Sequence, residues 1–309
     1  MKSLRLLALA PFALLVACGA SSDKDGLGGG NLDGGSNDGG LKLDAAPGVD
    51  TGGGGDGGLL TDTADDTTGI APGKSAVYAH SSDTLYKLDP DTLKVTEIGP
   101  FSDTAGGSVS QMTDIALDKD GVMFGVTFTA VYRIEYKSGA PKCTMLASLG
   151  TMFNGLTFIP AGTLDPTREV LIGVANDGGW HRIDVPLGAT KATVTKLGSY
   201  GGSLGSSGDS VGIIGDAVYS TVTGIGSTDH VVTVDPKTGR VIKDVGDTGV
   251  SGLWGVGYWG GTMYGFASSG SLYSIDLKTG RATEIPITGK PAGGWWGAGV
   301  TTAAPITIK

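Results

Sequence analysis

The sequence contains few residues that could cross-link the fold or bind a transition metal. Among its 309 residues there are two cysteines, Cys18 and Cys143, and three histidines, His80, His181 and His230. The histidines are far apart and lack the spacing of a zinc site, and Cys18 has no evident disulfide role. The sequence therefore predicts neither a zinc site nor a structural disulfide.

Positive charge and helical periodicity are also scarce. The 22 lysines and arginines are outnumbered by 31 aspartates and glutamates, which gives a net charge of −9 and argues against binding to nucleic acids. No segment of ten or more residues repeats its apolar residues every 3.6 positions, and the 56 glycines interrupt any candidate helix. A folded domain in this chain is therefore expected to be all-β.

An apolar run at the N-terminus has the features of an export signal. Lys2 and Arg5 precede the apolar residues 6–16, which are too few to span a membrane as a helix and are interrupted by Pro11. This arrangement predicts a segment that directs export and does not itself anchor the protein.

The end of this signal resembles the lipobox of bacterial lipoproteins, through Leu15-Val16-Ala17-Cys18-Gly19. The resemblance implies that residues 1–17 are removed as a signal peptide and that Cys18 carries acyl chains such as palmitate, which anchor the protein in a membrane. Because Gly19 stands where an aspartate would favour inner-membrane retention, the resemblance points to an outer-membrane lipoprotein that faces the periplasm or the cell surface. An ordinary secretory signal with an incidental cysteine is the alternative.

Residues 18–75, which begin with the cysteine, have the composition of a disordered tether. From residue 19 to residue 75 there are ten aspartates, three lysines and no aromatic residue. Such a segment buries too little apolar area to offset the entropy that it would lose on ordering. We expect an acidic linker with an end-to-end distance of about 40 Å.

Residues 76–309 are expected to form one β-domain, because a short apolar strand that ends in an acidic residue recurs five times. The copies are residues 85–89, 131–135, 180–184, 231–235 and 272–276, and their acidic ends are 46, 49, 51 and 41 residues apart. That spacing suits the four-stranded blades of a β-propeller.

Two copies continue into an Asp-x-x-Thr-Gly turn, at residues 235–239 and 276–280. The aspartate can accept backbone N–H bonds, and the glycine can take the left-handed conformation that closes the hairpin. Leu93 occupies the glycine position in the first copy, so a different closure is expected there. The turns resemble those of quinoprotein-like and YVTN-type bacterial β-propellers. Because Lys243 and Glu284 stand where quinoprotein repeats have tryptophan, no quinone cofactor is expected.

The chain order suggests how the ring closes. Inner strands are expected before four of the repeats, at residues 114–117, 155–159, 210–214 and 254–258, and the first blade lacks one. The C-terminal residues 296–300 repeat the pattern of residues 254–258. Pairing them with the first blade predicts a five-bladed ring without open strand edges. A six-bladed ring with one degenerate blade and a pair of packed β-sheets are the alternatives.

Candidate ligand-binding residues gather where the inner strands begin. In this topology, the loops that lead into the inner strands share one face with the loops between the second and third strands. The residues expected there are Asp114, Asn154, Asp209, Trp254 and Trp296, with Asn176, Asp177, Asp83 and Asp229 on neighbouring loops. Indole faces with carboxylates and an amide suit a carbohydrate. Alternatively, Trp254, Trp259, Trp295 and Trp296 fill the packing between blades.

The sequence therefore predicts a lipid-anchored protein of the cell envelope that binds a glycan or an envelope protein at the propeller mouth, with no cofactor. A glycoside hydrolase or another propeller hydrolase is the alternative, because two carboxylates at a suitable separation are the minimum that glycoside hydrolysis needs. The same acids could instead hold one Ca²⁺.

Overall fold

The computed structural model describes residues 76–136 and 139–308. This part of the chain contains 21 strands and no helix, so it holds no helical segment with the length and hydropathy of a membrane span. The predicted signal peptide, the lipidated Cys18 and the acidic tether all lie outside the described residues.

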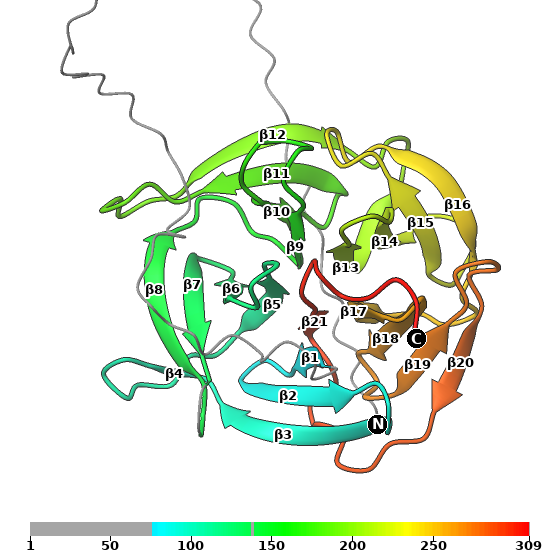
Figure 1. Cartoon of the computed structure of the whole chain (residues 1–309), viewed down its shortest axis with the longest axis horizontal. Helices are drawn as coiled ribbons and strands as arrows, with labels where there is room; N and C mark the ends of the chain where they lie inside the picture. Colours follow the sequence, from blue (N-terminus) through cyan, green and yellow to red (C-terminus); the bar gives the residue numbers. More distant parts are fainter. Residues whose placement is uncertain (1–75, 137–138, 309) are drawn as a thin grey trace, which may run out of the picture. The chain divides into compact units, whose positions relative to one another are not determined.

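The strands form five sheets that succeed one another around a central axis (Figure 1). Blade 1 consists of β1 (Val77–His80), β2 (Thr84–Asp89), β3 (Lys94–Pro100) and the last strand, β21 (Gly297–Gly299). Blade 2 consists of β5 (Met112–Leu117), β6 (Met123–Thr127), β7 (Ala130–Glu135) and β8 (Lys142–Ser148), with β4 (Ser102–Asp103) added parallel to β8.

The other three blades use four consecutive strands each. Blade 3 consists of β9 (Gly155–Ile159), β10 (Val170–Val174), β11 (Gly179–Asp184) and β12 (Thr193–Ser199). Blade 4 consists of β13 (Gly205–Gly212), β14 (Val218–Thr223), β15 (His230–Val234) and β16 (Val241–Asp247). Blade 5 consists of β17 (Leu253–Trp259), β18 (Thr262–Ala267), β19 (Leu272–Ile275) and β20 (Ala282–Ile285).

The C-terminal strand closes the ring, as predicted. In β21, Gly297 pairs with His80 and Gly299 pairs with Tyr78, so β21 becomes the inner strand of the first blade. The fold is therefore a five-bladed β-propeller, and the alternatives of six blades and of two packed sheets are wrong.

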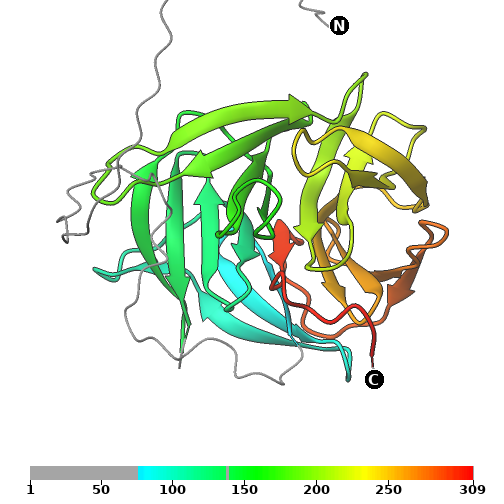
Figure 2. The same ribbon diagram turned by 45° about the horizontal axis from the view of Figure 1, so that its top comes forward.

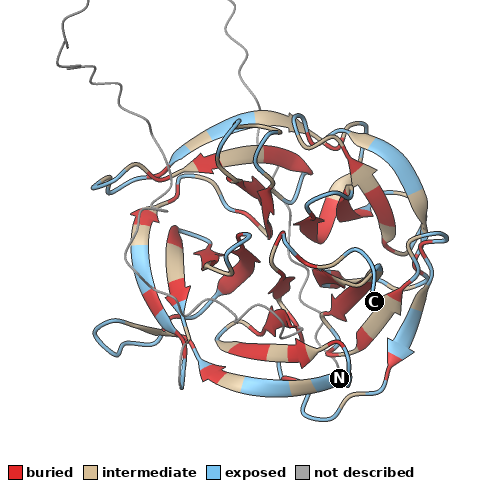
Figure 3. Cartoon of the chain, in the orientation of Figure 1, coloured by how far each residue is buried: buried red, intermediate tan, exposed pale blue. Residues whose placement is uncertain are grey.

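Burial decreases from the axis outward (Figure 3). Every residue of β5, β6, β9 and β10 is buried, whereas β3 and β16 are mostly exposed or half-buried. The four buried strands have neighbours on both faces, which explains their mostly apolar sequences. The outer strands contact solvent and carry the polar residues of each blade.

The hairpin turns close as their sequences predict, with one exception. Asp235 accepts the Lys237 N–H at 2.9 Å, and Gly239 has a φ of +72°. The expectation of a different closure at Leu93 is wrong. Leu93 adopts the same left-handed conformation, with a φ of +57°, and donates its N–H to the Asp89 carbonyl at 2.8 Å. The Asp91 and Thr92 N–H groups donate to Oδ1 of Asp89, and together these bonds hold a non-glycine residue in a conformation that usually favours glycine.

Strand boundaries differ from the prediction in blade 4. Its inner strand begins at Gly205, whereas the sequence predicts a start at residue 210. The five extra residues are glycine, serine and aspartate, so they carry no apolar alternation. The segment is held by pairing of Gly205 and Ser206 with β14, and the Ser206 N–H donates to the Asn176 carbonyl of blade 3 at 3.1 Å.

Trp295 fills the seam where the last blade meets the first. Its ring is fully buried and lies edge-on to Tyr86 of blade 1 and to Phe266 of blade 5, with centroids at 5.1 and 5.3 Å. Its Nε1–H donates to the Gly270 carbonyl at 3.0 Å. Trp180 makes a similar bond between blades 3 and 4, to the Pro236 carbonyl. The packing role considered for the tryptophans therefore applies to Trp295.

The residues after β21 cross the ends of the inner strands (Figure 2). Thr301 forms a bridge with Leu117, and the Thr302 carbonyl accepts the Ile214 N–H at 2.8 Å. Pro305 accepts the Gly260 N–H at 2.7 Å. This C-terminal segment, residues 300–308, thus covers the face of the ring at which the inner strands end.

The seam predicts a large difference between two tryptophan substitutions. Trp295→Ala should lower the free energy of unfolding by about 3–5 kcal/mol, because it removes a fully buried ring from the closing interface. Trp254→Ala should cost about 1 kcal/mol or less, because this ring is 40% exposed. Chemical denaturation of the full-length protein measures both, and equal losses would contradict the assignment of Trp295 to the seam.

Candidate functional site

Strand pairing places the starts of the inner strands and the loops between second and third strands on one face of the propeller, as predicted. Gly155 at the start of β9 pairs with Val174 at the end of β10, and Leu253 pairs with Ala267 in the same way. We call this side the loop face. It is the side opposite the C-terminal segment.

Asp114 lies at the axis of the ring and bonds two other blades. Its side chain is fully buried, and Oδ2 accepts the N–H of Leu156 in β9. Oδ1 accepts the N–H of Ala298 in β21 at 3.2 Å. A bulge between Met112 and Asp114 turns the aspartate toward the axis.

Asp209 occupies the matching position in blade 4 and bonds blade 5. It is fully buried, and Oδ2 accepts the N–H of Val256 in β17 at 2.8 Å. Its carboxyl group and that of Asp114 are within hydrogen-bonding reach of each other. The two side chains, which we call the carboxyl pair, thus connect the inner strands of all five blades.

Burial and proximity make the carboxyl pair retain a proton. Desolvation raises the pKa of Asp209 to about 8, and it raises the pKa of Asp114 together with the repulsion of Asp209. One carboxyl group that keeps its proton can donate it to the other, which removes the repulsion between two buried anions.

His80 lies beside the carboxyl pair as a neutral imidazole. Its Nδ1–H donates to the Ser81 carbonyl at 2.8 Å, and its Nε2 lies 3.8 Å from Oδ1 of Asp114. Desolvation lowers the pKa of His80 to about 4. Gly297 passes so close that a Cβ there would lie 2.3 Å from Asp114 Oδ1 and 2.4 Å from His80 Nε2. The axis is therefore closely packed, and position 297 requires glycine.

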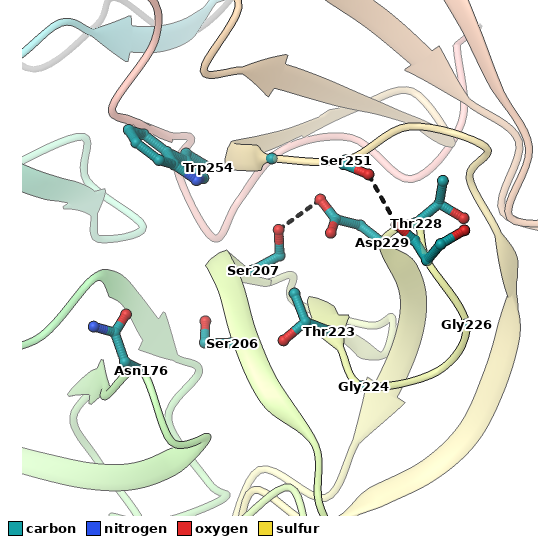
Figure 4. A pocket seen from close by; sticks show the side chains of 12 residues that line it. Asn176, Ser206, Ser207, Thr223, Gly224, Gly226, Thr228, Asp229, Ser251 and Trp254 are labelled. Atoms are coloured by element: carbon teal, nitrogen blue, oxygen red, sulfur yellow. Dashed lines mark hydrogen bonds between the residues drawn. The ribbon is translucent and has the colours of Figure 1, made fainter. Parts of the chain in front are cut away.

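A pocket opens on the loop face between blades 3, 4 and 5 (Figure 4). Its volume is about 400 Å³. The residues that line it are mostly small and polar: Asn176, Ser206, Ser207, Thr223, Gly224, Gly226, Ser227, Thr228, Asp229, Ser251, Gly252 and Trp254. Figure 4 shows Trp254 at one edge, Asn176 at another, and a hydrogen bond that joins Ser207 to Asp229.

The walls of the pocket are held by hydrogen bonds between blades. Oδ2 of Asp229 accepts the Ser207 hydroxyl at 2.5 Å and the Leu253 N–H at 2.7 Å. The Ser251 hydroxyl donates to the Ser227 carbonyl at 3.1 Å. These bonds fix the pocket before any ligand binds, which reduces the entropy lost on binding.

Trp254 presents its ring to the pocket because of a second bulge. The register of β17 shifts between Leu253 and Gly255, so Trp254 is 40% exposed while both neighbours are buried. Trp296 stands edge-on to it, with ring centroids 6.3 Å apart. Trp254 is thus an accessible aromatic surface, whereas the buried Trp295 is not.

The predicted site residues separate into three groups. Asn176 and Trp254 line the pocket, together with Asp229 from the neighbouring loops. Asp114 and Asp209 meet at the buried axis. The remaining four, Asn154, Asp177, Trp296 and Asp83, are not part of the pocket lining.

Sequence reasoning missed the hydroxyl groups of the pocket. Ser206, Ser207, Thr223, Thr228 and Ser251 belong to glycine- and serine-rich segments that resemble ordinary loops. The one usable signal is their position directly before or after predicted inner or second strands, on the loop face.

Comparisons with known proteins do not indicate a function for this chain. No protein-family model and no curated protein matches the chain. A structure solved in work on the de novo evolutionary emergence of a symmetrical protein is 15% identical, with a TM-score of 0.42, and the match covers 75% of this chain and 99% of that one. These likenesses concern the fold alone.

Two further solved structures are similar at the same level. A protein of unknown function from Bacteroides caccae is 10% identical, with a TM-score of 0.41 and coverage of 73% of this chain and 98% of that one. The computationally designed Ika8 protein is 15% identical, with a TM-score of 0.31 and coverage of 74% of this chain and 63% of that one.

Metal binding has no support from side-chain geometry. Within residues 76–136 and 139–308, no three His, Cys, Asp or Glu side chains are grouped so that they could hold a metal ion. A Ca²⁺ ion at the acidic residues stays a prediction.

The carboxyl pair predicts that stability falls as pH rises. The unfolded chain releases the shared proton near the ordinary aspartate pKa of 3.8, whereas the folded protein keeps it up to a pH of about 8. The free energy of unfolding should therefore decrease across this range, by at most about 1.4 kcal/mol per pH unit for each carboxyl group that keeps its proton. Asp209→Asn should reduce this slope, because the amide does not titrate, and its oxygen can still accept the Val256 N–H hydrogen bond.

The effect of the carboxyl pair is measured best between pH 6.5 and about 8. Below pH 6.5 the neutral His80 acts in the opposite direction, because unfolding lets it take up a proton. Chemical denaturation across the window measures the slope, with the exposed Glu284→Gln as the matched loss of one acid. An Asp209→Asn variant with the slope of the unaltered protein would contradict the shared proton.

Proposed function

We propose that this protein binds a saccharide in the Asn176–Asp229–Trp254 pocket and is held at the cell envelope by a lipid on Cys18. The single observation that carries the binding proposal is the partly exposed ring of Trp254 over a pre-formed polar pocket.

The chemistry of the pocket suits a sugar ring. The C–H face of a sugar can stack on an indole, and its hydroxyl groups can exchange hydrogen bonds with serine and threonine hydroxyls and with an amide. Asn176, Thr223 and Thr228 offer such groups around the pocket. Its volume of about 400 Å³ lies in the usual range of small-molecule sites, about 300–1,000 Å³.

The arrangement of carboxylates favours binding over glycoside hydrolysis. Hydrolysis needs an acid and a second carboxylate on opposite sides of the bond that is cut. Among the described residues that line the pocket, Asp229 is the one carboxylate. The carboxyl pair cannot assist, because Asp114 and Asp209 are fully buried and bonded to backbone amides.

The membrane anchor rests on the lipobox-like sequence before Gly19. Several acyl chains on one cysteine give stable attachment, since each buried CH₂ contributes about 0.8 kcal/mol. The acidic residues 19–75 would then separate the propeller from the lipid surface. In this arrangement the protein presents its saccharide site at the outer membrane.

The saccharide proposal predicts that Trp254→Ala weakens binding about tenfold or more, which corresponds to about 1.4 kcal/mol. A glycan array with the full-length protein in detergent, with and without Ca²⁺, identifies the bound sugar, and calorimetry measures its affinity. Phe128→Ala is the matched control, because Phe128 is 37% exposed on the loop face outside the pocket. Equal affinities of the two variants, or no glycan bound at all, would contradict the proposal and favour a protein partner.

The anchor proposal predicts that Cys18→Ala moves the protein from the membrane fraction to the soluble fraction. The substitution removes the sulfur to which the lipid is attached, and metabolic labelling with palmitate should be lost at the same time. Cys143→Ala is the matched control, because Cys143 is a buried free cysteine of the propeller. Retention of label and membrane attachment in Cys18→Ala would overturn the proposal.

A further inference from the structure

The pocket has a negative charge and no opposing cation. Among its lining residues, all of which lie in the described part of the chain, there is no lysine, arginine or histidine. Asp229 is the one ionisable side chain in this set, and only 3% of it is exposed. A ligand that enters the pocket therefore meets a single, nearly buried carboxylate.

One oxygen of this carboxylate is available to a ligand. Oδ2 accepts two hydrogen bonds, from Ser207 and from Leu253. No donor in the described chain bonds Oδ1, and this atom is not one of the buried polar atoms that lack a partner. Oδ1 is thus an acceptor without a bond in the described chain, on a residue that lines the pocket.

The bonds to Oδ2 fix the orientation of the free oxygen. The Leu253 N–H comes from the first residue of β17, directly before Trp254. The same short segment therefore positions the carboxylate and the indole. A carboxylate and an aromatic face held in one site form a pair that attracts a cationic group, through a charged hydrogen bond and a cation–π contact.

We infer that the pocket selects saccharides that carry a protonated amino group. The ammonium group would donate to Oδ1 of Asp229 while the sugar ring contacts Trp254. Acidic saccharides such as uronic acids would be rejected, because their carboxylates would face Asp229 without a cation to neutralise either charge. This inference rests on the proposed saccharide binding and specifies its ligand class.

Three disaccharides of similar size and different charge test this inference. They are the glucosamine disaccharide with free amino groups, its N-acetylated form and a galacturonic acid disaccharide. The affinities are measured by calorimetry with the full-length protein in detergent, at a pH below the pKa of the amino group. The amine should bind most tightly, the N-acetylated sugar about tenfold more weakly, and the uronate most weakly. Added NaCl should weaken binding of the amine and leave the neutral sugar unchanged.

The Asp229→Asn variant tests whether the preference for the amine comes from the pocket or from the overall negative charge of the protein. This variant should lose the preference for the amine and keep affinity for the N-acetylated sugar, because the asparagine oxygen can still accept the Ser207 and Leu253 hydrogen bonds. The matched control is Glu284→Gln, which removes one exposed negative charge from β20 outside the pocket. It should retain the full preference.

The outcomes distinguish this inference from the proposed function. If the neutral sugar binds and Trp254→Ala abolishes binding, but the uronate binds as well as the amine, the charge selection is wrong and the saccharide site stands. A preference that survives in Asp229→Asn would likewise overturn the selection. If the Asp229→Asn variant does not fold, the charge selection is decided by the relative affinities of the three sugars for the unaltered protein and by how these affinities change with salt. If none of the three sugars binds but the glycan array identifies another saccharide, the charge selection is wrong and the saccharide site stands. If the array also shows no bound glycan, both proposals fail.

Discussion

The propeller depends on how backbone N–H groups at its axis are satisfied. The innermost strand of each blade has one edge without a neighbouring strand, and a buried N–H group without an acceptor is costly. Leu156, Val256 and Ala298 present such groups, and the carboxyl oxygens of Asp114 and Asp209 accept them. Two side chains thus replace the strand partner that the inner edges lack, while their shared proton avoids two buried negative charges.

Bulges in the inner strands decide which side chains point toward the axis and which are exposed on the loop face. A bulge in β5 precedes Asp114, and the irregular register of β13 between Ser206 and Ser210 includes Asp209. The corresponding bulge in β17 turns Trp254 outward. An extra residue reverses the direction of the side chains that follow it. At the position of Asp114 and Asp209, β17 has Gly255, and the exposed Trp254 is the residue directly before it.

This reversal explains how far the sequence could predict the molecule. The number of blades and the ring closure follow from the repeats, because strand alternation and turn chemistry are local properties of the chain. The roles of Asp114 and Asp209 are not local. An acid at the start of an inner strand has the same sequence appearance whether it faces solvent or the axis, and the bulge that decides between them leaves no periodic signal. The hydroxyl groups of Ser206 and Ser207 were similarly hidden in a segment without apolar residues.

The closing strand also determines the order in which the protein can be completed. The first blade is synthesised first but lacks its inner strand until β21, the last strand of the chain, has been made. Residues 300–308 then cover the strand ends of blades 2, 4 and 5. The growing chain therefore has an open edge on β1, and the ring forms only after the final residues have been made. Until then the inner edge of blade 1 is free to pair with other chains.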